Sequence, residues 1–532
     1  MSSLWTFVLL WGVWLLIPII VDGVDACVRL VRVKMRGIGE QKDPVPDGAL
    51  PTVAIIVPAH NEAELIDRCL TSVRAQDYPH DRLEVIVVDD GSTDGTADIA
   101  EIHASEVAGV SAVTDGPVSP AAERTLVIRG EAISVGPFGG RFLVIRNGHA
   151  GKSHALNTGI EASSAEVIVN IDSDVVLAPG SIRAIAEAFA HDPELGAATG
   201  NIEIDWELLE DRDRGGHIIV GEDGLPAPRQ LRPMERFLAK SQFLEYLSSF
   251  RLGRHAQSVD DSMFTLAGAC SAFRRSAIEA TRGYSNRTVS EDTDMTWALH
   301  KAGVPIGFVP RARVLIEPVT SWDDLYGQRV RWARGQLEVS ALNKDTLKGQ
   351  KGKGRGGQTM PNLLLFDHTL AFPRLVWVPL ILFFPLLGYS PKLIAIAVAA
   401  MYALYLVIEG ISALTAFSVA EEDTRVRLEH CGLALLCLPF YRFVVFHFRF
   451  SGFLMTLTED QQWTVSGGFD HALQRFDIAR LRTVQMAGLL LRTATHLGSL
   501  VLTAVVQLAA PMLVGIAVVV GSVIMAIQRR SS

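Results

Sequence analysis

The chain has 532 residues, and 49% of them are hydrophobic. This composition excludes an ordinary single-domain soluble protein and predicts a membrane protein with a sizeable soluble part. The formal net charge of −9 at pH 7 provides no basic surface, so nucleic acid is not an expected partner. The five cysteines show no paired or zinc-binding spacing, which indicates a reducing compartment and no structural metal.

The chain begins with an apolar run over residues 4–21 that carries no charge and is long enough to cross a membrane. No small-residue cleavage site follows it, so we expect a retained helix rather than a signal peptide. Four basic residues come after the run and none before it: Arg29, Arg32, Lys34 and Arg36. The positive-inside rule then makes residues 1–36 a transmembrane helix with a basic cytoplasmic flank, and the N-terminus faces outside.

Residues 45–343 are predicted to form a cytoplasmic α/β domain, because short β-branched runs alternate there with helical stretches. The runs over residues 53–57 and 85–88 are typical of buried parallel strands, and residues 62–75 are expected to form the helix between them. Two segments rich in Gly, Pro and charge are expected to be surface insertions: residues 105–140 and 206–233.

A basic, Gly-rich segment over residues 344–361 separates this domain from a second apolar region. It has too few apolar residues to be buried, so we expect a flexible loop. Residues 362–455 are expected to hold transmembrane or interfacial helices, including a helical pair over residues 375–390 and 393–419.

The number of membrane spans stays open. Three residues interrupt the apolar run over residues 431–450: Pro439, Arg442 and His447. That run therefore has three alternatives, which are to span, to kink or to lie at the interface. A polar and amphipathic segment over residues 456–498 precedes a C-terminal span over residues 499–527, and the sequence favours neither four spans nor five.

Polar motifs follow the first two predicted strands, PAHNE over residues 58–62 and DDGSTD over residues 89–94. Ligands bind at the carboxyl ends of the strands in open α/β sheets. Glu62 and Asp90 are suited to accept hydrogen bonds from a uracil N–H or a ribose hydroxyl, and Pro58 and Asp89 are the neighbouring substrate-binding candidates. The alternative for DDGS is a solvated turn.

A third apolar run ends in DSD, which places Asp172 and Asp174 two residues apart and on the same face of an extended chain. Two converging carboxylates make a hard oxygen site suited to Mg²⁺ or Mn²⁺, with diphosphate oxygens as the remaining ligands. The alternative is that one of the two aspartates caps the following helix.

The segment VSEDTDMTWALHKAG places carboxylates at the start of an amphipathic helix. Asp292 is the first candidate for a general base and Glu291 is the second. The alternative is that the helix dipole alone favours acidic residues there. Lys152, in the Gly-flanked segment GHAGKSHALNTG, is a candidate phosphate contact.

A basic and aromatic motif, QRVRW, lies near the end of the predicted α/β domain and combines Gln328, Arg329, Arg331 and Trp332. Arg331 is suited to neutralise a diphosphate, and Trp332 can stack on the apolar face of a sugar. A basic, aromatic helix near a membrane is also compatible with an interfacial anchor.

In their order and approximate spacing over residues 53–335, these motifs resemble the processive branch of family 2 glycosyltransferases, which includes cellulose, chitin and hyaluronan synthases. The resemblance implies an α/β GT-A (Rossmann-like) cytoplasmic domain embedded between transmembrane helices. Within the family, the segments over residues 240–254, 264–278 and 328–339 are most similar to bacterial poly-β-1,6-N-acetylglucosamine synthases.

That resemblance implies a role for each motif in this chain. Asp172 and Asp174 would bind the metal, and Asp292 would be the base. Gln328, Arg331 and Trp332 would contact the acceptor and the pyrophosphate. The helix that carries Glu245 and Tyr246 would lie beside the acceptor.

The expected function is inverting transfer of a sugar from a UDP-sugar to a growing β-linked polysaccharide in the inner membrane, coupled to export. UDP-GlcNAc is the favoured donor and UDP-Glc the next. Membrane lipid is an expected partner, as are export or accessory subunits. Two alternatives remain: transfer of a single sugar to a lipid or short acceptor, and an inactive sugar-nucleotide-binding or scaffold subunit of a secretion complex.

Overall fold

The computed structural model describes residues 23–24, 26–31, 33, 43–106, 124–128, 131–135, 139–211, 219, 227–259, 261–343 and 384–458. The chain divides into two compact units, Met1–Val465 and Ser466–Ser532, and the described residues lie in the first. Several predicted features lie wholly or largely outside the described residues: the spans over residues 4–21 and 499–527, the helix over 375–390, the loop over 344–361 and the segment over 456–498.

Within the described residues, the main sheet has eight strands in the order β5-β2-β1-β6-β9-β8-β10-β7. Their bounds are β1 (Val53–Ala59), β2 (Leu83–Asp90), β5 (Arg141–Asn147), β6 (Val167–Ile171), β7 (Val176–Leu177), β8 (Ala197–Ile204), β9 (Cys270–Arg274) and β10 (Ile306–Ile316). The strands expected over residues 53–57 and 85–88 are confirmed as β1 and β2, each a few residues longer than expected.

The first half of the sheet is parallel: β1 pairs with β2 and β6, and β2 pairs with β5. The other half is mixed, because β9 lies antiparallel between β6 and β8 and β7 lies antiparallel beside β10. The four parallel strands β5, β2, β1 and β6 therefore end side by side at one edge of the sheet. This edge receives the polar motifs that follow the strands.

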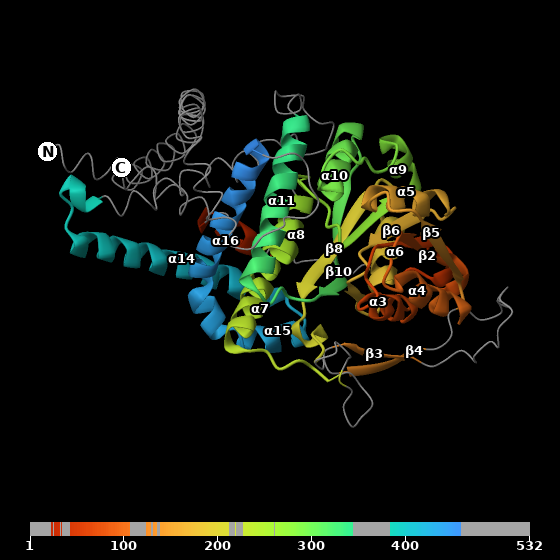
Figure 1. Ribbon diagram of the computed structural model, residues 1–532, viewed down its shortest axis with the longest axis horizontal. Coiled ribbons are helices and arrows are strands. Elements are labelled where there is room, and N and C mark those ends of the chain that lie inside the picture. Colours follow the sequence, from red (N-terminus) through yellow and green to blue (C-terminus); the bar gives the residue numbers. More distant parts are fainter. Residues whose placement is uncertain are drawn as a thin grey trace, which may run out of the picture. The chain divides into compact units, whose positions relative to one another are not determined.

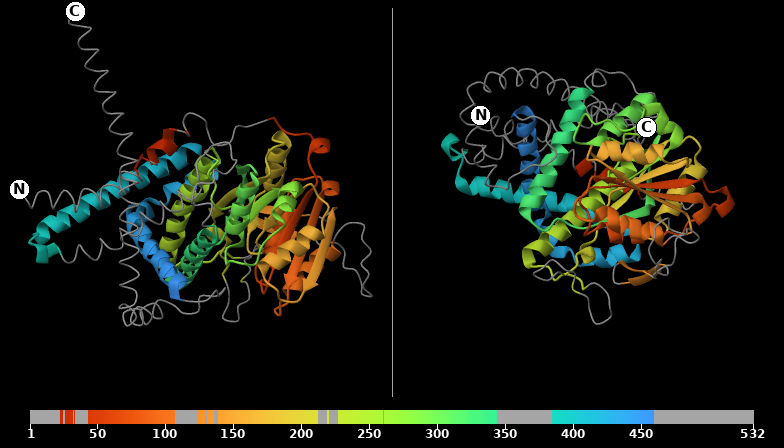
Figure 2. Two further views of the ribbon diagram at one scale, coloured as in Figure 1. Left: turned by 90° about the horizontal axis from the view of Figure 1, so that it is seen from above. Right: turned by 45° about the vertical axis from the view of Figure 1, so that its right-hand side comes forward.

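Helices cover both faces of this sheet (Figure 2). The helices of this part of the chain are α3 (Ile66–Arg74), α4 (Thr96–Ser105), α5 (Lys152–Glu161), α6 (Ser181–His191), α7 (Pro233–Tyr246), α8 (Arg254–Val259), α9 (Arg275–Thr281), α10 (Glu291–Ala302) and α11 (Trp322–Leu342). A π-helical segment, Leu247–Gly253, joins α7 to α8, and short 3-10 helices occur at Asp47–Ala49, His80–Arg82 and Trp206–Leu208.

The largest core cluster described lies between the sheet and helices α5, α9 and α10 (Figure 1). Ala54 and Ile56 of β1 contribute to it together with Leu156 of α5 and Leu299 of α10, and all four are nearly inaccessible to solvent. Because side chains alternate along a strand, the intervening residue Ile55 points to the opposite face, where α3 and α4 lie (Figure 1). Burial of both faces explains why β1 is an unbroken apolar run.

Helix α3 begins at Ile66, four residues later than expected from the sequence. The preceding residues are held instead by the DDGSTD turn and the start of α4. The backbone N–H of Glu62 donates to Thr96 Oγ1 at 2.8 Å, and that of Ala63 donates to Asp94 Oδ2 at 3.0 Å. These contacts join two segments that are more than 30 residues apart, which local periodicity does not reveal.

The described part of each predicted insertion contains antiparallel pairing. Residues 105–140 include an antiparallel pair, β3 (Arg124–Ile128) and β4 (Glu131–Val135). In residues 206–233, an isolated antiparallel bridge joins Glu210 to Pro228.

Two further helices are long and apolar enough to cross a membrane, judged by length and composition: α14 (Pro391–Val419) and α16, whose candidate span is Gly432–Gly452. A 3-10 helix, Phe384–Leu387, precedes α14, and α15 (Glu422–Glu429) connects α14 to α16. Helix α16 (Gly432–Thr458) is continuous through Pro439, and it packs along α11 (Figure 1). Among the alternatives for residues 431–450, the structure therefore has an unbroken helix.

Ion pairs attach this helical part to the sheet. Arg313 of β10 lies 2.9 Å from Glu203 Oε2 and 2.7 Å from Asp423 Oδ2, and Arg427 of α15 lies 2.7 Å from Asp205 Oδ1. The carboxyl end of β8, which carries Glu203 and Asp205, thus contacts the connection between the two candidate spans.

Candidate active site

The carboxyl ends of the four parallel strands bring together residues from four separate segments. His60 follows β1, Asp90 ends β2, His149 comes two residues after β5, and Asp172 follows β6. Register confirms the alignment of two of these ends, because Asp90 of β2 lies opposite Asn147 of β5. The PAHNE, DDGSTD and DSD motifs therefore meet at one edge of the sheet.

Asp90 fastens the loop that precedes α5. Its buried carboxylate accepts the backbone N–H groups of Ala150 at 2.8 Å and Gly151 at 2.9 Å. Gly91 makes this close approach possible, since it has a φ of +74° and a Cβ there would lie 2.7 Å from the backbone nitrogen of His149. The DDGS turn is thus packed against a neighbouring loop, rather than being only a solvated turn.

Asp89 and Pro58 are also buried, and their contacts are internal. The Asp89 carboxylate accepts the backbone N–H of Ser92 at 3.3 Å and so shapes the turn after β2. Pro58 lies within β1. Substrate contact by either residue remains a prediction.

Glu62 lies within electrostatic reach of the DSD carboxylates. The pKa of Glu62 is raised to about 7. The main cause is partial burial, and the negative charges of Asp174, Asp172 and Asp94 add to it. A carboxyl group with this pKa is partly protonated near neutral pH, so it can donate as well as accept a hydrogen bond.

Lys152 joins two of the predicted motifs. Its Nζ lies 2.6 Å from Asp172 Oδ1 and 2.9 Å from Glu291 Oε1. Burial alone would lower the pKa of Lys152, but the two carboxylates outweigh it and raise the pKa well above its usual value. The DSD loop, the start of α5 and the start of α10 therefore converge on one ammonium group.

Asp292 faces the same point. Its Oδ2 accepts the backbone N–H of Gly268 at 3.2 Å. A Cβ built on Gly268 would lie 3.5 Å from Asp292 Oδ2, 3.4 Å from Lys152 Nζ and 3.9 Å from Asp172 Oδ2. Burial and then the charge of Glu291 raise the pKa of Asp292 to about 6, so this carboxyl group is poised to exchange a proton near neutral pH.

The third carboxylate of the SEDTD segment differs from its neighbours. Asp294 forms a bidentate pair with Arg287, with distances of 2.9 and 2.6 Å. It has a structural partner, whereas Glu291 and Asp292 point to the shared cluster.

Asp174 remains accessible to solvent, although protein atoms packed around it reduce its solvation. That loss of solvation and the negative charge of Asp172 raise the pKa of Asp174 to about 6. Two hard oxygen donors that repel each other fit a divalent cation such as Mg²⁺ or Mn²⁺, which would relieve the repulsion. The metal role of this pair stays a prediction.

The QRVRW motif lies on α11 and divides into buried and half-buried residues. Arg329 is fully buried, and its Nη2 lies 2.7 Å from Glu245 Oε2 of α7. Tyr441 of α16 donates to the same oxygen at 2.7 Å. Burial alone would raise the pKa of Glu245, but Arg329, together with Arg442 and the Tyr441 hydrogen bond, outweighs it and lowers the pKa. Arg329 and Glu245, predicted to contact substrate, thus form an internal ion pair that connects α7, α11 and α16.

The half-buried residues of the motif are Gln328, Arg331 and Trp332. The Trp332 ring lies 4.3 Å from the Arg329 guanidinium, an arrangement that holds the indole by a cation–π contact. The Gln328 Oε1 atom is buried and has no hydrogen-bond partner among the described residues. Tyr246 is buried on α7 and stacks on Phe250, with 4.6 Å between ring centroids.

A close approach of two helices links QRVRW to the carboxylate cluster. A Cβ on Gly335 of α11 would overlap the side chain of Ser290, which is the N-cap of α10. Only glycine lets α11 pack this tightly on the residue preceding Glu291.

Two family models match this chain, glycosyl transferase family 2 over residues 54–114 and 122–282, and glycosyl transferase family group 2 over residues 236–409. Together they cover most of residues 54–409, including every motif described above. The chain belongs to glycosyltransferase family 2. Its α/β domain has a GT-A-like fold, and the main sheet of the described residues is mixed.

Curated relatives of this family 2 glycosyltransferase include synthases from two staphylococci. Poly-beta-1,6-N-acetyl-D-glucosamine synthase of Staphylococcus aureus (strain COL) is 25% identical over 335 residues, which are 63% of this chain and 64% of the relative. The synthase of the same name from Staphylococcus epidermidis is 26% identical over 287 residues, 54% of this chain and 55% of the relative. The matches thus span less than two thirds of the relatives' length.

A solved structure, the mannosyltransferase PcManGT from Pyrobaculum calidifontis in complex with GDP-Man and Mn²⁺, aligns with 84% of this chain and 98% of its own. Its sequence identity is 18% and its TM-score is 0.47.

Three residues of the site were not singled out from the sequence: His60, His149 and Gly268. The two histidines follow strand ends within the PAHNE and GHAGKS segments, and that position was the available signal. Gly268 carries no local signal, because its role depends on Lys152 and Asp292, which are distant in sequence.

Proposed function

We propose that this family 2 glycosyltransferase is an inverting, membrane-embedded synthase that transfers a sugar from a UDP-sugar to a growing β-linked polysaccharide. UDP-GlcNAc is the favoured donor, since the relatives are named poly-beta-1,6-N-acetyl-D-glucosamine synthases, and UDP-Glc is the next. The apolar helices α14 and α16 support a membrane location. The inner membrane, a cytoplasmic α/β domain and export of the product are further parts of the proposal.

The observation that carries this proposal is the position of Lys152 between Asp172 and Glu291. This arrangement brings together a carboxylate suited to bind metal (Asp172), a cation suited to bind phosphate (Lys152) and the start of α10, which carries Asp292. A donor diphosphate would interact with the metal bound by Asp172 and with Lys152. The acceptor hydroxyl would approach Asp292.

Asp172 and Asp174 would hold Mg²⁺ or Mn²⁺. The bound ion would stabilise the negative charge that develops on the departing UDP. Lys152, which lies between two carboxylates, is positioned to turn towards the phosphate oxygens of a donor.

Asp292 is the proposed base. The acceptor hydroxyl oxygen attacks the anomeric carbon, the bond from that carbon to the UDP oxygen breaks, and the hydroxyl proton passes to Asp292. Attack from the face opposite to UDP inverts the anomeric configuration. Glu291 is less suited to this role because it is paired with Lys152. Among the described residues, the Asp292 carboxylate accepts hydrogen bonds from neutral groups only.

The acceptor is proposed to lie against Trp332, with Gln328 and Arg331 beside it. Trp332 is half-buried and held by Arg329, so it offers a fixed aromatic face to a sugar. Retention of the product end after each addition would make the enzyme processive. The packing of α11 against α16 brings this motif close to the helices proposed to guide the product.

The test uses the purified full-length chain with labelled UDP-GlcNAc, UDP-Glc and other UDP-sugars, in the presence of Mn²⁺ or Mg²⁺. We expect transfer from UDP-GlcNAc, and a loss of about 10²- to 10⁴-fold in Asp292→Asn with donor binding retained. Asp294→Asn is the matched control on the same helix turn. Normal turnover by Asp292→Asn, together with inactive Glu291→Gln, would reverse the two roles, and no transfer from any UDP-sugar would reject the proposal.

A further inference from the structure

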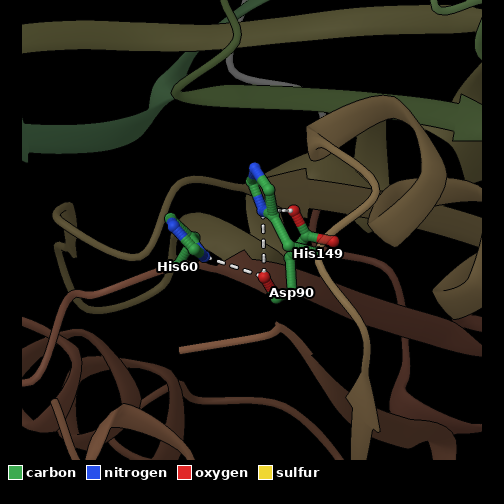
Figure 3. A group of neighbouring side chains, drawn as sticks. All are labelled: His60, Asp90 and His149. Atoms are coloured by element: carbon green, nitrogen blue, oxygen red, sulfur yellow. Dashed lines mark hydrogen bonds and ion pairs between the residues drawn. The ribbon is translucent and has the colours of Figure 1, made fainter. Parts of the chain in front are cut away.

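We propose that His60, Asp90 and His149 form a second metal site, specific for a first-row transition-metal ion of the Zn²⁺ type, and that an ion bound there blocks the donor nucleotide. The blocking effect rests on the proposed function together with the expectation from the sequence that Asp90 accepts hydrogen bonds from the donor nucleotide. The binding of the ion does not. Figure 3 shows the two imidazole rings close to each other, each with a dashed line to Asp90, and their centroids are 4.3 Å apart.

The three side chains offer converging ligand atoms. One atom from each residue can be chosen so that all lie within 4.8 Å of one another. His149 Nδ1 lies 2.9 Å from Asp90 Oδ2, and His60 Nδ1 lies 2.8 Å from the Asp90 carbonyl oxygen. Ligand atoms of a tetrahedral zinc ion lie roughly 3.3–3.6 Å apart, because each is roughly 2.0–2.2 Å from the metal. Small rotations of the two rings would open the trio to that spacing.

The site is fixed by the backbone on both sides. His149 is held by the Gly91 contact and by the two backbone N–H groups that follow it, which donate to Asp90. His60 is held through its neighbour Asn61, which has a φ of 55° and whose backbone N–H donates to Ser92 Oγ at 2.9 Å. Both loops are therefore attached to the DDGS turn, so the ligands are arranged before a metal arrives.

The donor set selects the class of metal. Two imidazole nitrogens and one carboxylate suit zinc and its neighbours in the first transition row, whereas Mg²⁺ and Mn²⁺ prefer oxygen ligands. The Asp90 carboxylate has lone pairs left after it accepts from Ala150 and Gly151, since an ionised carboxylate offers about four acceptor positions. Both histidines are exposed, so an ion can reach them without displacement of the core.

Occupation of this site would remove the nucleotide's partner. The carboxylate of Asp90 is the proposed acceptor for the uracil N–H or the ribose hydroxyl, and the metal would use the same oxygens. The ion would also restrain residues 149–151, which lead directly into Lys152. Inhibition should therefore be competitive with the UDP-sugar and insensitive to excess Mg²⁺, which fills the Asp172 and Asp174 site instead.

The first experiment is calorimetric titration of the purified full-length chain, free of any histidine tag, with Zn²⁺ and without donor. We expect a site in the wild type whose affinity falls in His60→Ala and in His149→Ala by more than the roughly 10- to 100-fold that loss of a residue supporting a ligand typically costs. His154→Ala, which removes a nearby exposed histidine of α5, is the matched control and should bind as the wild type does. Equal Zn²⁺ affinity in the wild type and in the His60→Ala/His149→Ala variant would overturn the metal site.

The second experiment repeats the Zn²⁺ titration in the presence of saturating UDP. We expect weaker apparent Zn²⁺ binding in the wild type and no such change in His149→Ala. Zn²⁺ binding that depends on both histidines but is unaffected by bound UDP would overturn the blocking effect. Absence of UDP binding would count against the proposed function instead, and the titration without donor would still decide the metal site.

Discussion

Replacing Glu245 with glutamine should destabilise the protein through Arg329, whose guanidinium is fully buried in the α11 helix. Glu245 Oε2 is the counter-ion of that group at 2.7 Å, and it also accepts from Tyr441 at 2.7 Å. Glutamine keeps the volume and one acceptor, but it leaves a buried cation without a compensating charge. Breaking a buried pair in this way typically costs about 3–5 kcal/mol.

The measurement is the apparent melting temperature of purified wild type and variants in one detergent. For a domain of this size, about 1 kcal/mol corresponds to ~2–4 °C, so Glu245→Gln should melt roughly 6–20 °C lower. Arg146→Gln is the matched control, because Arg146 pairs with Asp98 and Glu101 at the surface, where solvent screens the charges, so the melting temperature should hardly change.

The double variant Glu245→Gln/Arg329→Met separates charge from packing. Removal of both charges should recover much of the stability that Glu245→Gln loses, since the unpaired cation is gone. If Glu245→Gln melts as Arg146→Gln does, the ion pair does not hold α7, α11 and α16 together, and the reasoning is wrong.

Three further predictions concern the carboxylate cluster and its support. Asp292 acts as a base only when it is ionised, and its pKa is about 6. The value of kcat/KM should therefore rise with pH through about 6 and level off above it. A flat profile from pH 5 to 8 would contradict the assignment. Chelation with excess EDTA should abolish transfer, with recovery on addition of Mn²⁺ or Mg²⁺, and an active Asp174→Ala variant would remove the metal assignment. A methyl group at Gly335 would overlap the N-cap of α10, so Gly335→Ala should lower both activity and melting temperature. Gly327→Ala, on the same helix with open space around it, should raise the melting temperature slightly, and equal behaviour of the two variants would refute the close-packing argument.

The parallel strands and the motifs at their ends were predictable because both depend on local sequence. An unbroken apolar run such as residues 53–57 can be recognised as a buried strand without knowledge of its neighbours, and a polar motif that follows it must lie at the carboxyl end. The position of β9 between β6 and β8 had no such local signal, because it depends on pairing between residues about 100 apart.

The partners of charged residues were the least predictable part of the site. Arg329 and Glu245 are 84 residues apart, and nothing local indicates that they neutralise each other inside the protein. Lys152 was a candidate phosphate contact, and its position between Asp172 and Glu291 could not be foreseen from the sequence. Residue type and spacing identify groups capable of chemistry, whereas the division into catalytic and structural pairs depends on tertiary contacts.

The most direct test of the proposed synthase is the size of the product made by the purified full-length chain from labelled UDP-GlcNAc in excess, with Mn²⁺ or Mg²⁺ present. The account predicts a long polymer from the wild type and a shorter product, formed more slowly, from Trp332→Ala, because loss of aromatic stacking of about 1 kcal/mol weakens retention of the growing end. Donor affinity should be similar in the two proteins. Release of single-sugar adducts by the wild type, or equal product length from Trp332→Ala, would contradict processive synthesis at this site.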